Sequence, residues 1–570
     1  MSQHGIPHKL SYNGLTTDNG SQICNLFNQY FHSVFEPCND ANLTYYYETK
    51  LSHTPMDISH INIDLQNVLR QLKTINTNKG AGPDGIHPLL IFKCAEGLAY
   101  PITYIFKMSL KTGTFPCLWK KALITPIPKN DKRTDITQYR PISKLSIFGK
   151  LLEKIVTEQL FSAVHNYITP NQHGFFKGRS VETNMITFTQ DLLRALNGNM
   201  QVDVFYSDFS KAFDKVNHNI LLQRLWGVGV HGDLFRWVSS YIKNRSQAVC
   251  IKGFISDYIG IPSGVPQGSH LGPLLFTIYI NNIEDFVKNC KFLLYADDAK
   301  LYRVVANESD CRILQESIDS VSQYCTQSKL YLNNQKCQVI TYTRRRNPII
   351  FNYTLNAAPL ARVHSVRDLG IIMDSELTFN EHYDHIMKKA YRQLGFVLRV
   401  CKNFKSSLTY KTLYCSLVRS VLDFGSVVWN PFFDCHIKRL ERIQKKFIKS
   451  LNYKVGKSRT SYVDSLLFYR MHSLEMRRNI FDSMFLYKIL NNVIDSSTLL
   501  QNISLRVPTR STRSNNLFVI SNSSTRYTAN RYFCRSLDYY DKELSHLDLF
   551  NSSVNKFKSD LKLHMFSKLK

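Results

Sequence analysis

Two adjacent aspartates, Asp297 and Asp298, lie between the apolar runs Phe292–Tyr295 and Ala299–Tyr302. Both runs are β-prone and the corner between them is tight, which predicts a hairpin with the two carboxylates at its tip. Neighbouring carboxylates repel each other, so a fold that holds them together usually supplies a cation. Their hard oxygen atoms suit Mg²⁺ or Mn²⁺ better than zinc. The alternative is an exposed acidic turn without a ligand.

A third carboxylate, Asp208, ends another β-prone run, Val202–Ser207. Asp208 and Asp297 are 89 residues apart, so any pairing between them must be tertiary. An aspartate on each of two strands can hold a pair of metal ions for an in-line displacement at phosphorus. The three carboxylates therefore predict a phosphoryl-transfer site.

At these residues the chain resembles the reverse transcriptases of non-long-terminal-repeat retrotransposons, most closely the jockey-like group. The run Tyr295–Asp298 matches the catalytic turn of that family, Asp208 with Phe213 matches its first metal motif, and Gly264–Ser269 matches its template-and-nucleotide loop. The resemblance covers roughly residues 60 to 430, and several ordered motifs are more specific than any one of them. It implies an α+β right-hand polymerase with fingers, a palm of antiparallel sheet and helices, and a helical thumb.

The resemblance also implies RNA-directed DNA polymerase activity, with Asp208, Asp297 and Asp298 binding two Mg²⁺ ions for which Mn²⁺ can substitute. One ion would lower the pKa of the primer 3′-hydroxyl that attacks the α-phosphate. The other would steady the triphosphate and the departing pyrophosphate. The expected partners are an RNA template, a DNA primer and deoxynucleoside triphosphates, with no membrane.

Further residues are expected to bind the incoming nucleotide. Lys129 and Arg140 resemble the fingers cations that grip a triphosphate, and the planar fork of arginine can bond two phosphate oxygens. Phe213 matches a ring beneath the sugar that excludes a ribose 2′-hydroxyl. Gln267 and Gly268 belong to the loop that approaches the nucleotide, where glutamine can bond neutral groups. The structural alternatives are surface charges, a core phenylalanine and a plain turn.

Two motifs follow the acidic hairpin. Leu330–Lys336 resembles the motif whose lysine protonates the leaving pyrophosphate, which makes Lys336 a candidate general acid or, alternatively, a solvated lysine. Val366–Ile372 matches the primer-grip hairpin of the family. From about residue 380 the pattern is helical, and an apolar stripe with cations on the other face suits a thumb helix beside a duplex. That stripe consists of Ile437, Leu440, Phe447 and Ile448.

Two supporting elements can be read from local pattern. Apolar residues at helical spacing from Ile61 to Leu72 predict a helix with Ser59 as its cap. The run Ala122–Lys129 predicts a strand, and its prolines, Pro126 and Pro128, fit a sheet edge. Residues 1–58 are polar with scattered aromatics and show no recognisable chemistry.

The whole chain has 570 residues and a net charge of +28, of which residues 381–570 hold +19. Such a balance favours a polyanionic partner. Its 13 cysteines show no zinc-ligand spacing, and no signal segment or apolar span is found. We therefore expect an intracellular protein that is nuclear at the step of reverse transcription. The expected domains are an N-terminal extension (1–58), fingers and palm (59–375), a thumb (376–500) and a basic C-terminal region (501–570).

Two alternatives stay open at this stage. One is a degenerate or domesticated element product that binds RNA without polymerising. The other is a group II intron maturase, which often carries a zinc-containing endonuclease after the thumb, although the sequence has no Cys/His cluster for one. Jockey-like elements also carry an endonuclease ahead of the polymerase, and roughly 60 leading residues are too few for it. We therefore expect a truncated copy or partial gene model without target-site cleavage.

Overall fold

The computed structural model describes residues 6–7, 10–12, 15–37, 57–129, 133–404, 406–507, 516–520 and 526–569. The chain divides into two compact units. Unit 1 consists of Met1–Phe175, Asp208–Lys288 and Asp319–Asn333. Unit 2 consists of Phe176–Ser207, Asn289–Ile318 and Asn334–Lys570. Both combine β-sheet with helices, which confirms the predicted α+β class.

A five-stranded mixed sheet forms the centre of unit 1. Its strands are β3 (Lys121–Pro128), β4 (Tyr139–Lys144), β6 (Arg245–Ile251), β7 (Phe254–Ile255) and β8 (Ile259–Ile261). The order is β4-β3-β6-β7, with β8 also paired to β6; β3 is antiparallel to β4 and parallel to β6.

The prediction that β3 is an edge strand is wrong for its first half. Pairing with β6 covers Lys121–Ile124, so this part of β3 is interior. Pro126 and Pro128 lie beyond it, where β3 pairs with β4 alone. Because proline has no N–H, the prolines occupy the half of the strand that needs only one hydrogen-bonded neighbour.

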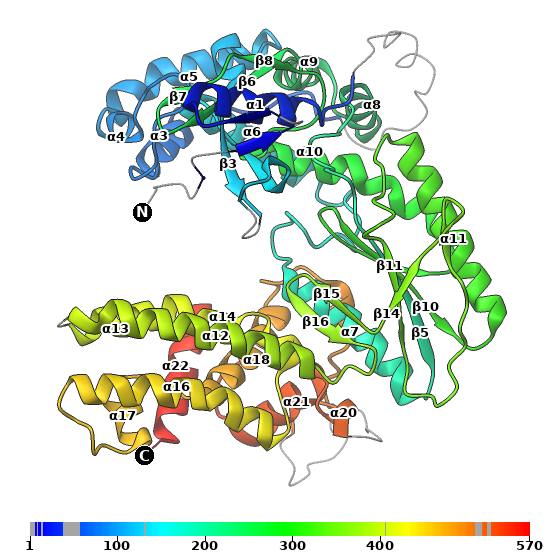
Figure 1. The fold of residues 1–570 in the computed structure, drawn as a ribbon, viewed down its shortest axis with the longest axis vertical. Coiled ribbons are helices and arrows are strands. Elements are labelled where there is room, and N and C mark those ends of the chain that lie inside the picture. The colour runs from blue at the N-terminus through cyan, green and yellow to red at the C-terminus, as the bar shows by residue number, and fades with distance from the viewer. Residues whose placement is uncertain are drawn as a thin grey trace. The chain divides into compact units, whose positions relative to one another are not determined.

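Helices cover the unit 1 sheet and form the rest of the unit (Figure 1). They are α1 (Gly20–His32), α3 (Leu65–Lys73), α4 (Pro88–Lys93), α5 (Ala95–Lys111), α6 (Ile147–Val164), α8 (His218–Val228), α9 (Gly232–Ile242) and α10 (Leu271–Ile280), with 3₁₀ turns η1 (Cys117–Lys120), η2 (Ile136–Gln138) and η3 (Asn281–Phe286) and the hairpin β1 (Leu10–Tyr12) and β2 (Leu15–Thr17).

The predicted helix over 61–72 is present as α3. Its cap is Asp64 and not Ser59, because the Asp64 carboxylate accepts the Asn67 N–H.

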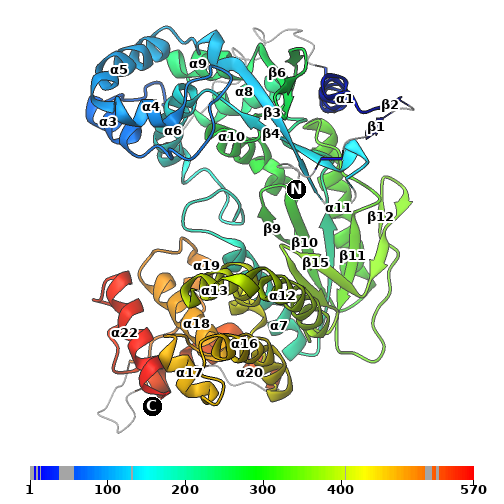
Figure 2. The same cartoon turned by 60° about the vertical axis from the view of Figure 1, so that its left-hand side comes forward.

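The N-terminal helix α1 packs on the unit 1 sheet, against β6 and β7 (Figure 2). Cys24, Phe27 and Phe31 lie on one helical face and share a core with Ile124 of β3 and Val249 of β6. The Asn19 side chain caps the helix by accepting backbone N–H groups of its first turn. Residues 20–32 are thus an integral layer of unit 1.

A second five-stranded sheet belongs to unit 2 and has the order β14-β11-β5-β10-β9. Figure 1 labels four of its strands, β5, β10, β11 and β14. The strands are β5 (Gln201–Ser207), β9 (Lys291–Tyr295), β10 (Asp298–Val305), β11 (Gln338–Tyr342) and β14 (Ala361–Val363). The central strand β5 is antiparallel to both β10 and β11. Its first five residues, Gln201 to Phe205, are all buried, and the polar Gln201 and Asp203 among them are hydrogen-bonded to each other.

Two short hairpins and a set of helices complete unit 2. The hairpins are β12 (Thr354–Leu355) with β13 (Ala358–Pro359), and β15 (Ser365–Asp368) with β16 (Ile371–Asp374), the second of which confirms the hairpin predicted over 366–372. The helices are α7 (Val181–Asn197), α12 (Asn380–Val400), α13 (Ser407–Leu413), α14 (Ser420–Asp423), α15 (Ser426–Trp429), α16 (Asp434–Lys454), α17 (Tyr462–Phe468), α18 (Leu474–Leu490), α19 (Ser497–Leu500), α20 (Arg526–Ala529), α21 (Tyr532–Tyr539) and α22 (Val554–Ser567), with η4 (Cys401–Asn403) and the π-helical η5 (Tyr414–Arg419) and η6 (Tyr540–Leu544). Helix α11 (Glu308–Gln327) runs from unit 2 into unit 1 along the chain.

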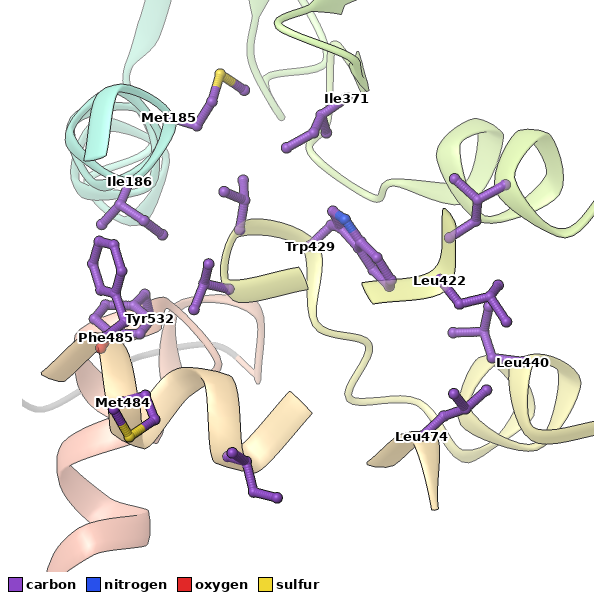
Figure 3. Packing of buried hydrophobic residues seen from close by; sticks show 14 of the residues in the cluster. Met185, Ile186, Ile371, Leu422, Trp429, Leu440, Leu474, Met484, Phe485 and Tyr532 are labelled. Atoms are coloured by element: carbon purple, nitrogen blue, oxygen red, sulfur yellow. The ribbon is translucent and has the colours of Figure 1, made fainter. Parts of the chain in front are cut away.

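One hydrophobic core joins the helices of unit 2 (Figure 3). Ile186 of α7, Trp429 of α15 and Leu440 of α16 belong to it, together with Phe485 of α18 and Tyr532 of α21. Helices on both sides of residue 500 therefore share one interior. The apolar stripe predicted for α16 is confirmed, with Leu440, Phe447 and Ile448 buried.

Candidate active site

The acidic hairpin has the tight form that the sequence predicts. Strands β9 and β10 pair with Tyr295 opposite Asp298, so Ala296 and Asp297 form a two-residue loop. Ala296 has a φ of 57°, a left-handed conformation that is unfavourable for a residue with a Cβ and that tends to occur at functional sites. Asp297 is half-buried and Asp298 is exposed. The turn thus presents two neighbouring carboxylates.

Asp208 directly follows the central strand of the same sheet. Ser207, the last residue of β5, pairs with Ala299 of β10, and its hydroxyl donates to the Ala299 carbonyl at 3.2 Å. Along the two chains, Asp208 is the residue after Ser207 and Asp298 is the residue before Ala299. Because the strands are antiparallel, this register brings the position after β5 and the first position of β10 to the same end of the sheet. Strands β5 and β10 are therefore paired although they are distant in sequence, and the gathering of the three carboxylates around a metal ion stays a prediction.

The chemistry of these side chains suits a hard divalent cation. Carboxylate oxygens are the ligands that Mg²⁺ and Mn²⁺ prefer, and both aspartates of the turn are accessible. In the part of the chain that the structure describes, no three or more His, Cys, Asp and Glu side chains are gathered as a preformed metal site. The donor atoms fit a divalent ion, which would offset the repulsion between adjacent carboxylates.

A buried polar network supports the turn from behind. Lys300, two residues after Asp298, forms an ion pair with Asp368 of β15. The Tyr206 hydroxyl of β5 donates to the same Asp368 carboxylate at 3.2 Å. Burial lowers the pKa of Lys300, while the nearby Asp368 opposes this shift. Sequence reasoning missed this network, because its members come from three separate strands.

The predicted nucleotide loop folds closely against the segment that follows Asp208. A Cβ on Gly264 would come within 2.7 Å of the Asp214 carbonyl oxygen, and one on Gly268 within 2.7 Å of the Ser143 carbonyl oxygen. Both glycines have positive φ, so the loop requires glycine at these positions for conformation and for space. The half-buried Gln267 donates its side-chain amide N–H to the Asp214 carboxylate at 2.8 Å. Its backbone carbonyl accepts the Ser143 backbone N–H. Gln267 is therefore oriented by its contacts with both neighbouring segments.

Phe213 is half-buried among aromatic rings. Its ring stacks on Phe276 of α10 at a centroid distance of 4.3 Å and meets Phe175 edge-on at 5.8 Å. Its carbonyl accepts the Val265 N–H at 2.9 Å, which joins it to the nucleotide loop. The ring is thus fixed in place while part of it stays accessible, as a residue that screens the sugar would require.

The two predicted fingers cations lie on neighbouring chain segments of unit 1. Arg140 of β4 pairs in register with Ile127 of β3, and its side chain is exposed. Lys129 follows β3, and its ammonium donates to the Thr137 carbonyl at 3.2 Å. Burial raises the pKa of Asp214, whose carboxylate binds Gln267, to about 6, and the charge of Lys129 opposes this shift. The structure thus brings Lys129 into electrostatic range of the nucleotide loop.

The candidate general acid, Lys336, is exposed in a turn before β11. Just before this turn, Leu332 forms a β-bridge with Phe209, and the Asn333 N–H donates to the Asp208 carbonyl at 2.7 Å. Just after it, Gln338 pairs with Tyr206. The chain on both sides of Lys336 is therefore tied to the strand and loop that carry Asp208, and its role as an acid stays a prediction.

Comparison with known proteins agrees with these motifs. Residues 127–396 match the family described as "Reverse transcriptase (RNA-dependent DNA polymerase)". Together with the relatives below, this match confirms the resemblance to jockey-like reverse transcriptases that the sequence motifs indicate.

Relatives of this chain include two proteins of Drosophila melanogaster. The chain is 26% identical over 459 residues to "Probable RNA-directed DNA polymerase from transposon BS", covering 77% of this chain and 50% of that protein. It is 26% identical over 409 residues to the RNA-directed DNA polymerase from mobile element jockey, covering 68% and 44%. The chain therefore spans about half the length of the curated relatives it matches.

Among solved structures, a truncated apo telomerase from Candida tropicalis matches with a TM-score of 0.33 and 14% identity, over 47% of this chain and 55% of that one. No helix in the described part of the chain is both long and apolar enough to cross a membrane.

Proposed function

We propose that the chain is the RNA-directed DNA polymerase of a jockey-like non-long-terminal-repeat retrotransposon, which adds deoxynucleotides to a primer 3′-hydroxyl. The observation that carries the proposal is the register of β5 and β10, which sets Ser207 opposite Ala299 and so brings the position of Asp208 to the end of the sheet where Asp297 and Asp298 form the turn. The reverse transcriptase match over residues 127–396 supports it.

Asp208, Asp297 and Asp298 would hold two Mg²⁺ ions or, in their place, Mn²⁺. Such ions supply Lewis-acid activation of the attacking hydroxyl and neutralise charge on the triphosphate. Lys129 and Arg140 bind phosphate oxygens, with Arg140 suited to a bidentate contact. Gln267, held by Asp214, faces base or sugar, and Phe213 excludes the 2′-hydroxyl. Lys336 is the candidate donor of a proton to pyrophosphate.

The partners in this proposal are an RNA template, a DNA primer and deoxynucleoside triphosphates, and the place of action is the nucleus. The exposed cations of α16 supply a surface for the duplex backbone. They are Lys438, Arg442, Lys445, Lys446 and Lys449. Imaging the tagged full chain in cells during element mobilisation tests the localisation.

Primer extension on poly(rA)/oligo(dT) with Mg²⁺ tests the activity. We expect Asp208→Asn, Asp297→Asn and Asp298→Asn each to reduce the rate by at least about 10³-fold, because each removes a charged metal ligand. Asp310→Asn is the matched control, since Asp310 binds Arg303 at the far end of β10. Activity that survives Asp297→Asn contradicts the metal assignment. A wild-type chain that binds RNA without extending the primer supports a non-polymerising element product instead.

A further inference from the structure

Lys211 lies between Asp208 and Phe213 and has no assigned role. It is half-buried, and its φ of 55° is unusual for a residue with a side chain. Its ammonium donates to the Tyr30 hydroxyl oxygen at 2.8 Å and lies 4.3 Å from the centroid of the Tyr30 ring. Tyr30 belongs to the N-terminal helix α1. A residue 181 positions away along the chain therefore fixes this lysine.

Lys211 and Lys129 belong to one chain of hydrogen bonds. The Tyr30 hydroxyl, which accepts from Lys211, donates to the Thr137 carbonyl at 3.3 Å. The Lys129 ammonium donates to the same carbonyl at 3.2 Å. Two ammonium groups are thus held around one carbonyl and one hydroxyl, in the corner where Gln267 and Phe213 also lie.

Charges of both signs surround Lys211: Lys129 and Lys215 are accompanied by the acids Asp135, Asp214 and Glu36. Lys215 has its own partner, Glu36, at 2.9 Å. The charge of Asp214 acts on Lys211, but Asp214 is buried and already accepts the Gln267 amide. Among the residues that the structure describes, Lys211 forms no ion pair within 4.0 Å. The pKa of Lys211 is lowered to about 8, mainly by burial; the charge of Asp214 opposes this shift, and the charges of Lys129 and Lys215 add to it.

A lysine ammonium carries three N–H donors, and Tyr30 takes one of them. The remaining donors can bond to anionic oxygens, for which a lysine is a compact point charge. An oligophosphate brings several such oxygens and would offset the repulsion between the lysines of this corner. Neutral ligands would leave that repulsion in place.

We propose that Lys211, positioned by Tyr30 of α1, binds the oligophosphate of the incoming nucleotide together with Lys129. The site rests on the proposed polymerase function and extends it, because it makes the N-terminal helix a working part of the nucleotide site. The Tyr30 ring face attracts the ammonium and the hydroxyl oxygen accepts a hydrogen bond from it, so both parts of the tyrosine orient Lys211.

Calorimetric binding of inorganic tripolyphosphate to the full chain, without primer or template and at about 0.15 M salt, tests the site directly. We expect Lys211→Met to weaken binding about tenfold and Lys211→Arg, which keeps the charge, to stay within about threefold of wild type. Tyr30→Phe keeps the ring and α1 packing but loses the hydroxyl, and we expect it to weaken binding about threefold. Lys215→Met is the matched control, because Lys215 is paired with Glu36.

The proposal is overturned if Lys211→Met binds tripolyphosphate as wild type does, or if Lys215→Met weakens binding equally, which would indicate a general charge effect. Thermal unfolding of each variant identifies any loss of fold, and Lys211→Arg and Tyr30→Phe keep the test decisive if Lys211→Met does not fold. Primer extension separates the two proposals. A wild-type chain that binds tripolyphosphate through Lys211 but extends no primer contradicts the polymerase proposal and supports this site.

Discussion

Lys300 and Asp368 form an ion pair inside unit 2, where their side chains are only 4% and 5% exposed. Lys300 lies on β10 two residues after Asp298, and Asp368 ends strand β15. The Tyr206 hydroxyl of β5 donates to the same Asp368 carboxylate. The strand of the acidic turn, the strand that leads to Asp208 and the β15–β16 hairpin therefore share one buried electrostatic contact.

Removing one partner of this ion pair should lower the free energy of unfolding. Lys300→Met leaves the Asp368 carboxylate buried without its cation, and we expect the free energy of unfolding to fall by about 3–5 kcal/mol. Lys300→Met with Asp368→Leu replaces both charges by apolar groups and should recover most of that loss. Urea unfolding of the full chain measures both. Lys291→Met is the control, because Lys291 is largely exposed and its partner Asp191 keeps the Tyr302 hydroxyl as a donor, so the loss should be at most about 1 kcal/mol. Equal losses for the two single variants would contradict the prediction.

Phe213 should determine the selectivity for deoxyribonucleotides over ribonucleotides. Phe213→Val removes the ring that would meet a 2′-hydroxyl, and we expect the ratio of kcat/KM for ribonucleotides to that for deoxyribonucleotides to rise about 10- to 100-fold. Single-nucleotide primer extension measures the ratio. Phe175→Leu, which changes the ring touching the edge of Phe213, should leave the ratio nearly unchanged. If the Phe213→Val variant still excludes ribonucleotides, the sugar of the nucleotide does not bind next to Phe213, and the prediction is wrong.

Local pattern was sufficient to predict the strands and turns of the site. The acidic hairpin, the strand before Asp208 and the helix after the nucleotide loop all follow from runs of apolar residues punctuated by turn residues. Apolar spacing that starts at Ile61 predicts Ser59 as the cap of α3, whereas Asp64 stands directly before the first helical residue and is the cap. An aspartate before the first helical residue was a signal that could have corrected it.

Contacts between distant segments could not be predicted in this way. The parallel pairing of β3 with β6 joins Lys121 to Ser246, and neither strand carries a local sign of it. Residues 1–58 show no recognisable chemistry, although Ile23, Phe27 and Phe31 at helical spacing behind Asn19 indicate an amphipathic helix, which carries Tyr30. That this helix reaches Lys211 depends on the tertiary fold.

His218 should make stability depend on pH. Its ring Nε2–H donates to the Gly264 carbonyl at 2.8 Å, and burial lowers its pKa to about 4. As the pH falls, the His218 side chain of the unfolded chain takes up a proton near pH 6.5, before that of the folded chain does. The contribution of His218 to stability is therefore constant above pH 6.5 and falls as the pH drops toward 4. We expect wild type to lose about 3 kcal/mol over this interval relative to His218→Gln, which keeps an N–H donor. Denaturant unfolding at several pH values measures the difference, and parallel pH curves would contradict it.

Substitution of Gly264 tests whether the close approach of the nucleotide loop to Phe213 matters for function. Gly264→Ala adds a Cβ 2.7 Å from the Asp214 carbonyl and 2.9 Å from the Phe213 carbonyl, at a φ of 85°. We expect a loss of about 2–3 kcal/mol in the free energy of unfolding, from backbone strain and the displaced loop. The KM for the nucleotide should rise more than kcat falls, because the loop carries Gln267 and bonds to Phe213 through Val265.

Gly260→Ala in β8 is the matched control, since nothing lies within 4 Å of its added Cβ. It should change stability by less than about 0.5 kcal/mol and leave the KM for the nucleotide unchanged. Primer extension at varied nucleotide concentration, with urea unfolding of the same preparations, separates the two effects. If Gly264→Ala lowers stability but leaves the nucleotide KM at the wild-type value, the loop supports the fold without shaping the nucleotide site. A raised KM in both variants would instead mean that any change in this region disturbs binding, because Gly260→Ala creates no overlap.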